Sequence, residues 1–374
     1  MPGFQDAWKG CLPIFKSSKD SGYSSGEDSD TTHGHASRKM YKPNDTYKRI
    51  KTLETGDEGS CTVVKSATTG KLLVVKSIEI KKNRSVNGEK VGRRKPLPNE
   101  ARMLERLRPH PNIIHFFGKE QSCAFRGWHL LFMEYCTGGD LLEQLRKFQD
   151  MKIPTPEIFT LLVFIGLAQA LACIHHGLRH EKSTTYHKDA GHISMIHGDI
   201  KPDNVFLRWR NSNTTGLPDV VLADFGMAQL ACESWGITGT PTYEAPEVKA
   251  ITDLRESDPK EYTRRKNAPG IMSTKSDVYG LGLVLYLMVK DGKQFESGAD
   301  PMIVELPERY QDVTGLLAAL CWCLQPDPEL RPECTAALDN GLLHAVDTFE
   351  KKRDAMCKTT GVLERSIWNV TKLE

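Results

Sequence analysis

The chain has 374 residues, of which 39% are hydrophobic and 26% charged, an ordinary composition for one large two-lobed domain or two small ones. A formal net charge of only +2 argues against nucleic acid or an anionic membrane as the main partner. The ten cysteines show no paired framework, which favours a reducing compartment. Residues 1–9 lack the apolar core of a secretory leader, so we expect a cytoplasmic or nuclear location.

Residues 1–44 form a polar tail rich in serine and aspartate, which we predict to be disordered because it has too little apolar surface to bury. Within the tail, residues 20–25 read D-S-G-Y-S-S. This pattern resembles a phosphodegron, in which Ser21 and Ser25 would be phosphorylated and then recognised by a ubiquitin ligase. A solvated tail without that role is the simpler alternative, since short motifs often match by chance.

The pattern of the ordered chain predicts two lobes of different composition. Residues 45–135 contain short β-rich runs and one helical stripe, with a basic insert at 81–98 that is either a docking or nuclear signal or a solvated loop. Residues 136–346 are predicted to be mainly helical, and 347–374 to be a helical extension or tail. We therefore expect an α+β fold with a small β-rich lobe and a large α-helical lobe.

Three features of the predicted helical lobe stand outside this plan. The apolar stretch 158–174 is shorter than the about 20 residues of a membrane span, so we expect a buried helix and no membrane insertion. The insert 179–195 holds His180, His187 and His192, which suggest either zinc ligands or ordinary residues of a polar loop. The insert 251–270 is rich in charged residues.

The strongest chemical signal consists of two motifs in the second half of the chain. Residues 197–204 read H-G-D-I-K-P-D-N, and residues 223–226 read A-D-F-G. In this order and spacing they resemble the catalytic loop and the metal-binding triplet of eukaryotic-type protein kinases. The resemblance extends over roughly residues 47–345 and implies the bilobal protein kinase fold.

Four residues of these motifs receive roles from the resemblance. Asp199 would lie beside the attacking hydroxyl as its base, and Lys201 would steady the transferring phosphoryl group. Asn204 and Asp224 would be ligands of Mg²⁺, whose charge compensates the phosphates of ATP. ATP and Mg²⁺ are therefore the expected cofactors.

A degenerate glycine-rich loop precedes these motifs. Residues 53–61 read L-E-T-G-D-E-G-S-C, in which Gly56 and Gly59 match two of the family's glycines and Cys61 follows them. Alone, this stretch is a weak match and is more typical of an ordinary hairpin. Lys76 lies fifteen positions after Cys61, where the family places the lysine that holds the α- and β-phosphates.

Glu100 is the expected partner of Lys76. With Met103, Leu104 and Leu107 it follows the i, i+3, i+4, i+7 spacing of one helix face, so its carboxylate lies on an apolar stripe. A carboxylate in that place needs a partner to offset desolvation, although a solvated position at the edge of the stripe is the alternative. The following H-P-N-I-I at 110–114 resembles the family's next loop and favours a Lys76–Glu100 ion pair.

Residues 132–140 read F-M-E-Y-C-T-G-G-D and resemble the hinge between kinase lobes. The resemblance implies Met133 as gatekeeper, adenine bonded by the backbone of Glu134 and Cys136, and Asp140 near the ribose.

Residues 239–247, G-T-P-T-Y-E-A-P-E, resemble the end of the activation segment. Here the resemblance implies two structural roles: Asp277 would brace the catalytic loop, and Glu247 would pair with Arg331.

The predicted function is phosphorylation of serine or threonine in protein substrates. The K-P-D-N of residues 201–204 is the serine/threonine form, and a G-T-P to A-P-E segment is absent from the small-molecule phosphotransferases that share an H-G-D loop. Besides a small-molecule phosphotransferase, the other alternative is a pseudokinase that acts as a scaffold without catalysis, which the degenerate phosphate loop favours.

Two further expectations concern regulation and origin. Gly198 replaces the arginine that receives the activation-loop phosphate in the family, so we expect activity without a phosphate in residues 227–238. The H-G-D-I-K form, the polar inserts and the tail resemble kinases of large DNA viruses, including herpesvirus-type ones, which would act in a host cell.

Overall fold

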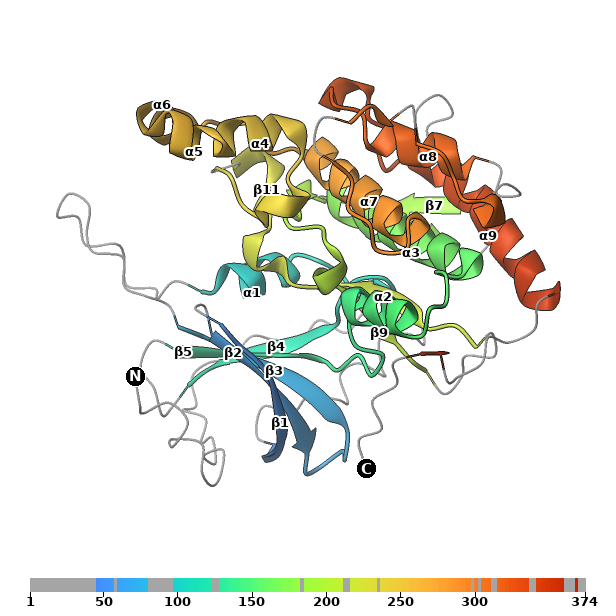
Figure 1. Ribbon diagram of the computed structural model, residues 1–374. Helices are drawn as coiled ribbons and strands as arrows, with labels where there is room; N and C mark the ends of the chain where they lie inside the picture. The colour runs from blue at the N-terminus through green and yellow to red at the C-terminus, as the bar shows by residue number, and fades with distance from the viewer. Residues whose placement is uncertain are drawn as a thin grey trace. The chain divides into compact units, whose positions relative to one another are not determined.

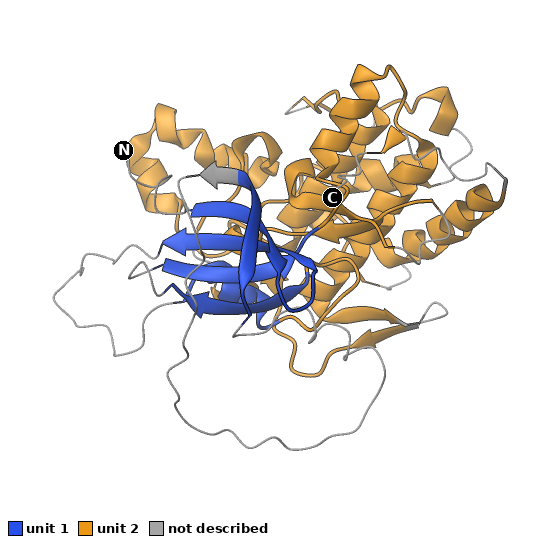
Figure 2. Ribbon diagram, turned by 90° about the horizontal axis from the view of Figure 1, so that it is seen from below, with its two compact units in different colours: residues 1–106, 115–135 blue, residues 107–114, 136–374 orange. Residues whose placement is uncertain are grey.

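The computed structural model divides the chain into two compact units. It describes residues 45–56, 59–79, 97–122, 128–181, 185–210, 216–233, 236–296, 299–301, 304–310, 315–335, 341–359 and 367–368. Unit 1 contains residues 1–106 and 115–135, and unit 2 contains residues 107–114 and 136–374 (Figure 2). The predicted tail, with Ser21 and Ser25, and most of the basic insert 81–98 lie outside the described residues.

Unit 1 is built on one antiparallel sheet (Figure 1). Its strands are β1 (Tyr47–Gly56), β2 (Gly59–Ser66), β3 (Leu72–Glu79), β4 (Phe116–Gln121) and β5 (Trp128–Glu134), in the spatial order β1-β2-β3-β5-β4. Alternate residues of β3 are buried, as expected when one face of a strand covers a core. That core gathers Leu73 and Val75 of β3 with Tyr47 of β1 and with Leu130 and Phe132 of β5.

The helix of unit 1 is shorter than the apolar stripe predicted. Helix α1 runs from Asn99 to Leu104, and Leu107 lies beyond its end, half-buried and in unit 2. A proline removes a backbone donor and disfavours helical geometry in the residue before it, which accounts for an end ahead of Pro109. The stripe therefore predicted the face of Glu100 but not the length of the helix.

Residues 107–114, assigned from sequence to the first lobe, belong to unit 2. Ile114 donates its backbone N–H to the carbonyl of Leu222 at 2.8 Å. The side-chain amide of Asn112 donates to the carbonyl of Val220 at 2.9 Å. These bonds to a strand of unit 2 are not visible in local sequence patterns.

Unit 2 is mainly helical, with short two-stranded sheets (Figure 1). Its helices are α2 (Leu141–Asp150), α3 (Glu157–His176), α4 (Pro246–Thr252), α5 (Leu254–Ser257), α6 (Pro259–Arg265), α7 (Thr274–Val289), α8 (Leu316–Cys323) and α9 (Leu342–Thr359). Its strands are β6 (Leu178–Glu181), β7 (Thr185–Lys188), β8 (Met195–Ile196), β9 (Val205–Arg208), β10 (Asp219–Leu222) and β11 (Gln229–Leu230). With the sheet of unit 1, these elements confirm the predicted α+β class.

Helix α3 is the centre of unit 2. It packs against α7, α9 and β10, and Phe164 meets Phe349 of α9 with ring centroids 5.0 Å apart. Among the described residues it is the one helix long and apolar enough to cross a membrane, and 89% of its most apolar window is buried inside the protein. Such burial is typical of a core helix.

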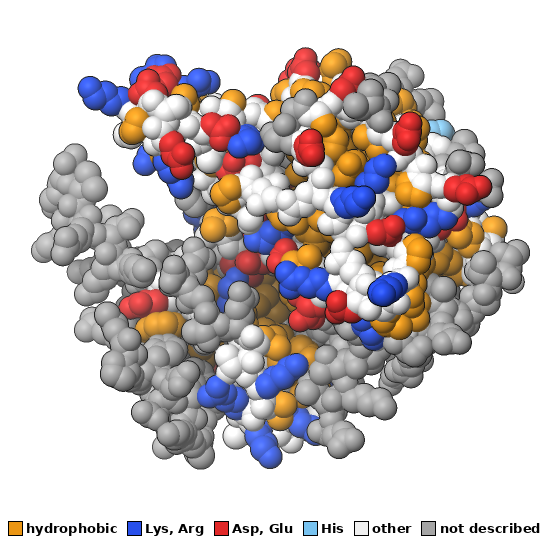
Figure 3. Space-filling view, viewed as in Figure 1, with side chains coloured by type: hydrophobic (Ala, Val, Ile, Leu, Met, Phe, Trp, Pro, Cys, Tyr) orange, Lys and Arg blue, Asp and Glu red, His pale blue; other side chains and the backbone are white. Residues whose placement is uncertain are grey.

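The predicted inserts of unit 2 have regular structure where they are described. Strands β6 (Leu178–Glu181) and β7 (Thr185–Lys188) pair antiparallel, and the charged stretch 251–270 holds α5 and α6, where acidic and basic side chains are interspersed on the surface (Figure 3). The predicted lobe boundary at residue 346 falls inside α9, which begins at Leu342. Because α9 buries Val346 and Phe349, the unit continues through this helix.

Candidate active site

The loop 197–204 is held in place by one buried carboxylate. Asp277 of α7 accepts the backbone N–H groups of His197 at 2.7 Å and of Gly198 at 2.8 Å. Its Oδ2 also lies 2.8 Å from Nε2 of His175 in α3. A buried carboxylate is tolerated when donors surround it, and here those donors fix the backbone of the loop. This is the bracing contact that the resemblance implied.

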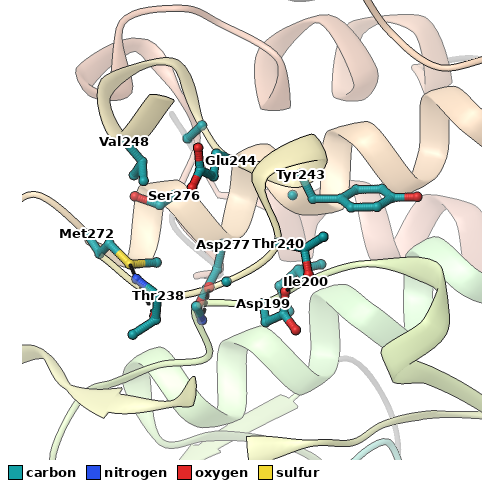
Figure 4. Close-up of a pocket in the computed structure, with 14 residues that line it drawn as sticks. Asp199, Ile200, Thr238, Thr240, Tyr243, Glu244, Val248, Met272, Ser276 and Asp277 are labelled. Atoms are coloured by element: carbon teal, nitrogen blue, oxygen red, sulfur yellow. Dashed lines mark hydrogen bonds between the residues drawn. The ribbon is translucent and has the colours of Figure 1, made fainter. Parts of the chain in front are cut away.

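Asp199 lies at the centre of a compact polar cluster, of which Figure 4 shows Asp199 and Thr240 side by side. Its carboxylate is only 8% exposed, and Oδ2 accepts the side-chain amide of Asn204 at 2.9 Å and lies 2.9 Å from Nζ of Lys201. Its Oδ1 accepts the hydroxyl of Thr240 at 2.8 Å, and Lys201 donates to the same hydroxyl at 2.7 Å. Three side chains therefore orient one carboxylate.

Thr240 is a member of this cluster that the sequence analysis did not single out. It lies within the G-T-P-T stretch of residues 239–242, which the sequence identified only as part of the end of the activation segment. The position of its hydroxyl depends on the close approach of that segment to the loop. Gly239 (φ +106°) makes the approach achievable, because a Cβ there would lie 2.3 Å from the carbonyl oxygen of Gly198.

The donor set around Asn204 and Asp224 suits a hard cation. The amide nitrogen of Asn204 points to Asp199, donating to its carbonyl at 2.8 Å and to its Oδ2, so the amide oxygen is not engaged in these bonds. Asp224 has a left-handed backbone (φ 59°) and accepts the N–H of Gly226 at 3.3 Å. Amide and carboxylate oxygens are the ligands that Mg²⁺ prefers, so these residues fit the ion.

In unit 1 the structure brings Lys76 and Glu100 together. Nζ of Lys76 lies 2.8 Å from Oε2 of Glu100, whose side chain is 2% exposed. Cys61 of β2 is the cross-strand neighbour of Lys76. Gly56 and Gly59 face each other where β1 and β2 meet, and a Cβ on Gly59 would come 1.8 Å from the carbonyl oxygen of Ser77. Glycine is therefore required at residue 59.

The hinge residues fall at the division of the two units. Met133 is buried in β5, and Glu134 closes that strand. The backbone N–H of Glu134 donates to the backbone carbonyl of His115 at 3.0 Å. The carboxylate of Glu134 accepts the backbone N–H of His115 at 2.8 Å. Cys136 is buried at the start of this part of unit 2. Adenine recognition by Glu134 and Cys136, and Met133 as gatekeeper, stay predictions.

Asp140 caps helix α2 in unit 2. Its carboxylate accepts the backbone N–H of Glu143 at 2.8 Å. Burial, together with the charges of Glu143 and Asp203, raises the pKa of Asp140 to about 6. Its predicted place beside the ribose stays a prediction.

Glu247 and the buried Arg331 form a bidentate pair in unit 2. Nη1 of Arg331 donates to Oε1 of Glu247 at 2.8 Å, and Nη2 donates to Oε2 at 2.7 Å. The arginine is 0% exposed and also donates to backbone carbonyls, including that of Gln325 at 2.7 Å. This pair joins the start of α4 to the loop after α8, which is a structural role.

The fold and these residues define a phosphotransferase of the protein kinase type. The model of the family described as "Protein kinase domain" matches residues 47–343. The chain therefore belongs to the protein kinase domain family.

Several protein kinases of fungi and mammals are similar to the chain. It is 28% identical to "G2-specific protein kinase nim-1" of Neurospora crassa, over 83% of this chain and 34% of that protein. It is 29% identical to "Serine/threonine-protein kinase Nek2" of Homo sapiens, over 82% of this chain and 62% of that protein. It is 26% identical to "G2-specific protein kinase nimA" of Emericella nidulans, over 79% and 40% of the two chains. The chain thus spans from about a third to about three-fifths of the length of these relatives.

These relatives are cellular proteins and do not support the viral affiliation suggested by the sequence, which stays a prediction.

Proposed function

We propose that the protein is a serine/threonine protein kinase, which transfers the γ-phosphate of Mg-ATP to hydroxyl groups of protein substrates. The observation that carries this proposal is the environment of Asp199, whose carboxylate is held by Asn204, Lys201 and Thr240. Phosphoryl transfer asks an enzyme mainly for position and charge compensation, and this cluster supplies both within one loop.

The residues suggest a division of labour during transfer. Asp199 would accept the proton of the substrate hydroxyl. The hydroxyl oxygen would then bond to the γ-phosphorus of ATP as the bond between that phosphorus and the β–γ bridging oxygen breaks. The ammonium of Lys201, 2.9 Å from the same carboxylate, lies where it would offset negative charge on the transferred group. Mg²⁺ held by Asn204 and Asp224 would supply further charge compensation to the phosphate oxygens. In unit 1, Glu100 would hold Lys76 ready for the α- and β-phosphates.

A peptide is the substrate class that unit 2 favours. An open pocket of about 380 Å³ adjoins Lys201 and Thr240 and is lined also by residues of α2 and α7. It carries both signs of charge, with Arg146 and Asp203 in its lining, beside the apolar Leu287. The pocket borders Lys201 and Thr240, the two side chains that contact Asp199, so an acceptor side chain bound there would lie close to the candidate base.

The test is transfer of labelled γ-phosphate from Mg-ATP to a mixed protein substrate by wild type and by Asp199→Asn. Removing a positioned general base typically costs about 10²–10⁴-fold in rate, so the variant should fall close to background. Asp150→Asn is the matched control, because Asp150 lies exposed at the end of α2. Its rate should equal that of wild type.

The labelled amino acid identifies the reaction. Phosphoserine or phosphothreonine made by wild type and by Asp150→Asn is the expected product. Equal near-zero signals from all three proteins, with ATP binding intact, would instead favour a nucleotide-binding scaffold.

We further propose that the protein acts in the cytoplasm or nucleus. Recognition of the Ser21–Ser25 motif by a ubiquitin ligase stays a prediction, as does the absence of nucleic-acid and membrane partners.

A further inference from the structure

A second group of metal-ligating side chains lies in unit 2 outside the kinase machinery. The hairpin of β6 and β7 follows α3 directly, and both β6 and α9 pack against α3 (Figure 1). His180 belongs to β6, while Asp347 and Glu350 belong to α9. The two carboxylates are three residues apart in that helix, so they lie on the same face.

The donor atoms of these three residues converge. One ligand atom from each of His180, Asp347 and Glu350 lies within 4.8 Å of the other two. Nε2 of His180 is 4.0 Å from Oε2 of Glu350, which is longer than a hydrogen bond. The other carboxylate oxygen, Oε1 of Glu350, accepts the side-chain amide of Gln169 in α3 at 3.1 Å. That bond fixes the glutamate with its second oxygen towards the histidine.

Three buried polar atoms in and beside this cluster lack hydrogen-bond partners among the described residues. Nε2 of His180 and Oδ1 of Asp347 are buried and form no hydrogen bond within the described part of the chain. The same holds for the hydroxyl of Tyr186, the cross-strand neighbour of His180. Burial, and after it the charges of Asp347 and Glu350, raises the pKa of that tyrosine. Unpartnered buried acceptors beside a second carboxylate make an environment that a cation would relieve.

We propose that His180, Asp347 and Glu350 bind one divalent transition-metal ion. One imidazole nitrogen and two carboxylate oxygens form a donor set that suits Zn²⁺, with a fourth position for water. Donors around a tetrahedral zinc ion lie about 3.4 Å apart, given bonds of about 2.0–2.2 Å, so rotation of these side chains would close the site. The ion would fasten the β6–β7 hairpin to α9.

This site differs from the histidine cluster that the sequence suggested. His187 is exposed on β7, and Nε2 of His192 lies 2.9 Å from the carbonyl oxygen of Ile174. Only His180 of the three joins the carboxylates. The two acidic ligands come from a distant part of the chain, where nothing in the local sequence marks them.

The site is tested by zinc binding to the full chain after removal of metal with a chelator. Zinc chloride is titrated into wild type, His180→Ala and His187→Ala in competition with a chromophoric chelator. Because the three proteins have the same cysteines, any zinc that cysteines bind is the same in each of them. Wild type and His187→Ala should bind one zinc ion more than His180→Ala, or bind it at least about tenfold more tightly. Zinc should raise the Tm of the first two proteins and not of the third. Identical stoichiometry, affinity and Tm response in all three would overturn the proposal.

Folding of the variants is checked by circular dichroism and by the Tm in excess EDTA. Should His180→Ala not fold, Glu350→Gln decides by the same comparison, since it keeps the size of the side chain. Unchanged zinc binding in a folded Glu350→Gln would also overturn the site. None of these readouts depends on kinase activity.

Discussion

Three buried carboxylates show how single residues prepare the candidate active site. Glu100 is paired with Lys76, Asp277 accepts two backbone N–H groups, and Asp199 is surrounded by three donors. In each case the donors restrict where the oxygen atoms lie. Asp140 behaves differently, because hydrogen bonds to its carboxylate offset burial only in part and its pKa is raised.

We predict that Asp140 makes stability depend on pH. Burial raises the pKa of its carboxyl from the usual 3.8 to about 6, so between these values the folded protein holds a proton that the unfolded chain has released. The unfolding free energy contributed by this group is therefore highest below about pH 4 and falls as the pH rises to about 6. The loss is complete only once the pH lies well above about 6, where the folded protein has also released the proton.

Asp140→Asn removes this titration while keeping a side chain that caps helices well. Urea unfolding at pH 4.5 and pH 7 should show the variant gaining stability relative to wild type at the higher pH. A difference between the two proteins that is the same at both pH values would contradict the raised pKa.

At the scale of elements, the segment 236–247 is placed by direct contacts with the catalytic loop. Gly198 has φ +77°, and a Cβ on it would lie 2.6 Å from the hydroxyl of Thr238. The backbone N–H of Thr238 contacts the sulfur of Met272 at 3.1 Å (Figure 4). A large side chain in place of Gly198 would be strained and crowded, so an arginine that reads a phosphate does not fit here.

We therefore predict that phosphorylation of residues 227–238 is not needed for activity. Alanine at both Ser234, which lies outside the described residues, and Thr238 should leave the rate of phosphate transfer nearly unchanged. Thr240→Ala is the matched control in the same segment. It removes the hydroxyl between Asp199 and Lys201 and should cost about 10²-fold, as misplaced catalytic groups do. If the double variant lost as much activity as Thr240→Ala, the prediction that phosphorylation of this segment is not needed would be wrong.

Features determined by interactions between residues close in the sequence could be predicted, whereas features determined by contacts between distant segments could not. Short motifs with fixed spacing predicted the loop 197–204, and the apolar period predicted which face of α1 carries Glu100. The hydroxyl of Thr240 and the metal ligands of α9 did not follow. Each depends on contacts between segments far apart in the chain, which local periodicity does not record.

At the scale of the whole chain, a segment close to the last residue is anchored in unit 2. The carbonyl oxygen of Trp368 accepts Nζ of Lys147 in α2 at 2.6 Å. Its ring, 2% exposed, packs edge-on against Phe159 at 4.9 Å, Phe148 at 6.0 Å and Trp209 at 5.7 Å. Helices α2 and α3 therefore share part of their core with this distant segment.

We predict that Trp368→Ala destabilises unit 2. Truncation of a buried tryptophan typically costs about 3–5 kcal/mol, through lost burial and the cavity left behind. Trp322→Ala is the matched control, because Trp322 of α8 is 54% exposed and its removal should change stability by no more than about 0.5 kcal/mol. Denaturant unfolding followed by far-ultraviolet circular dichroism measures both. Equal midpoints for the two variants would mean that the segment around Trp368 adds nothing to the core, and α2 and α3 would then owe their stability to the rest of unit 2 alone.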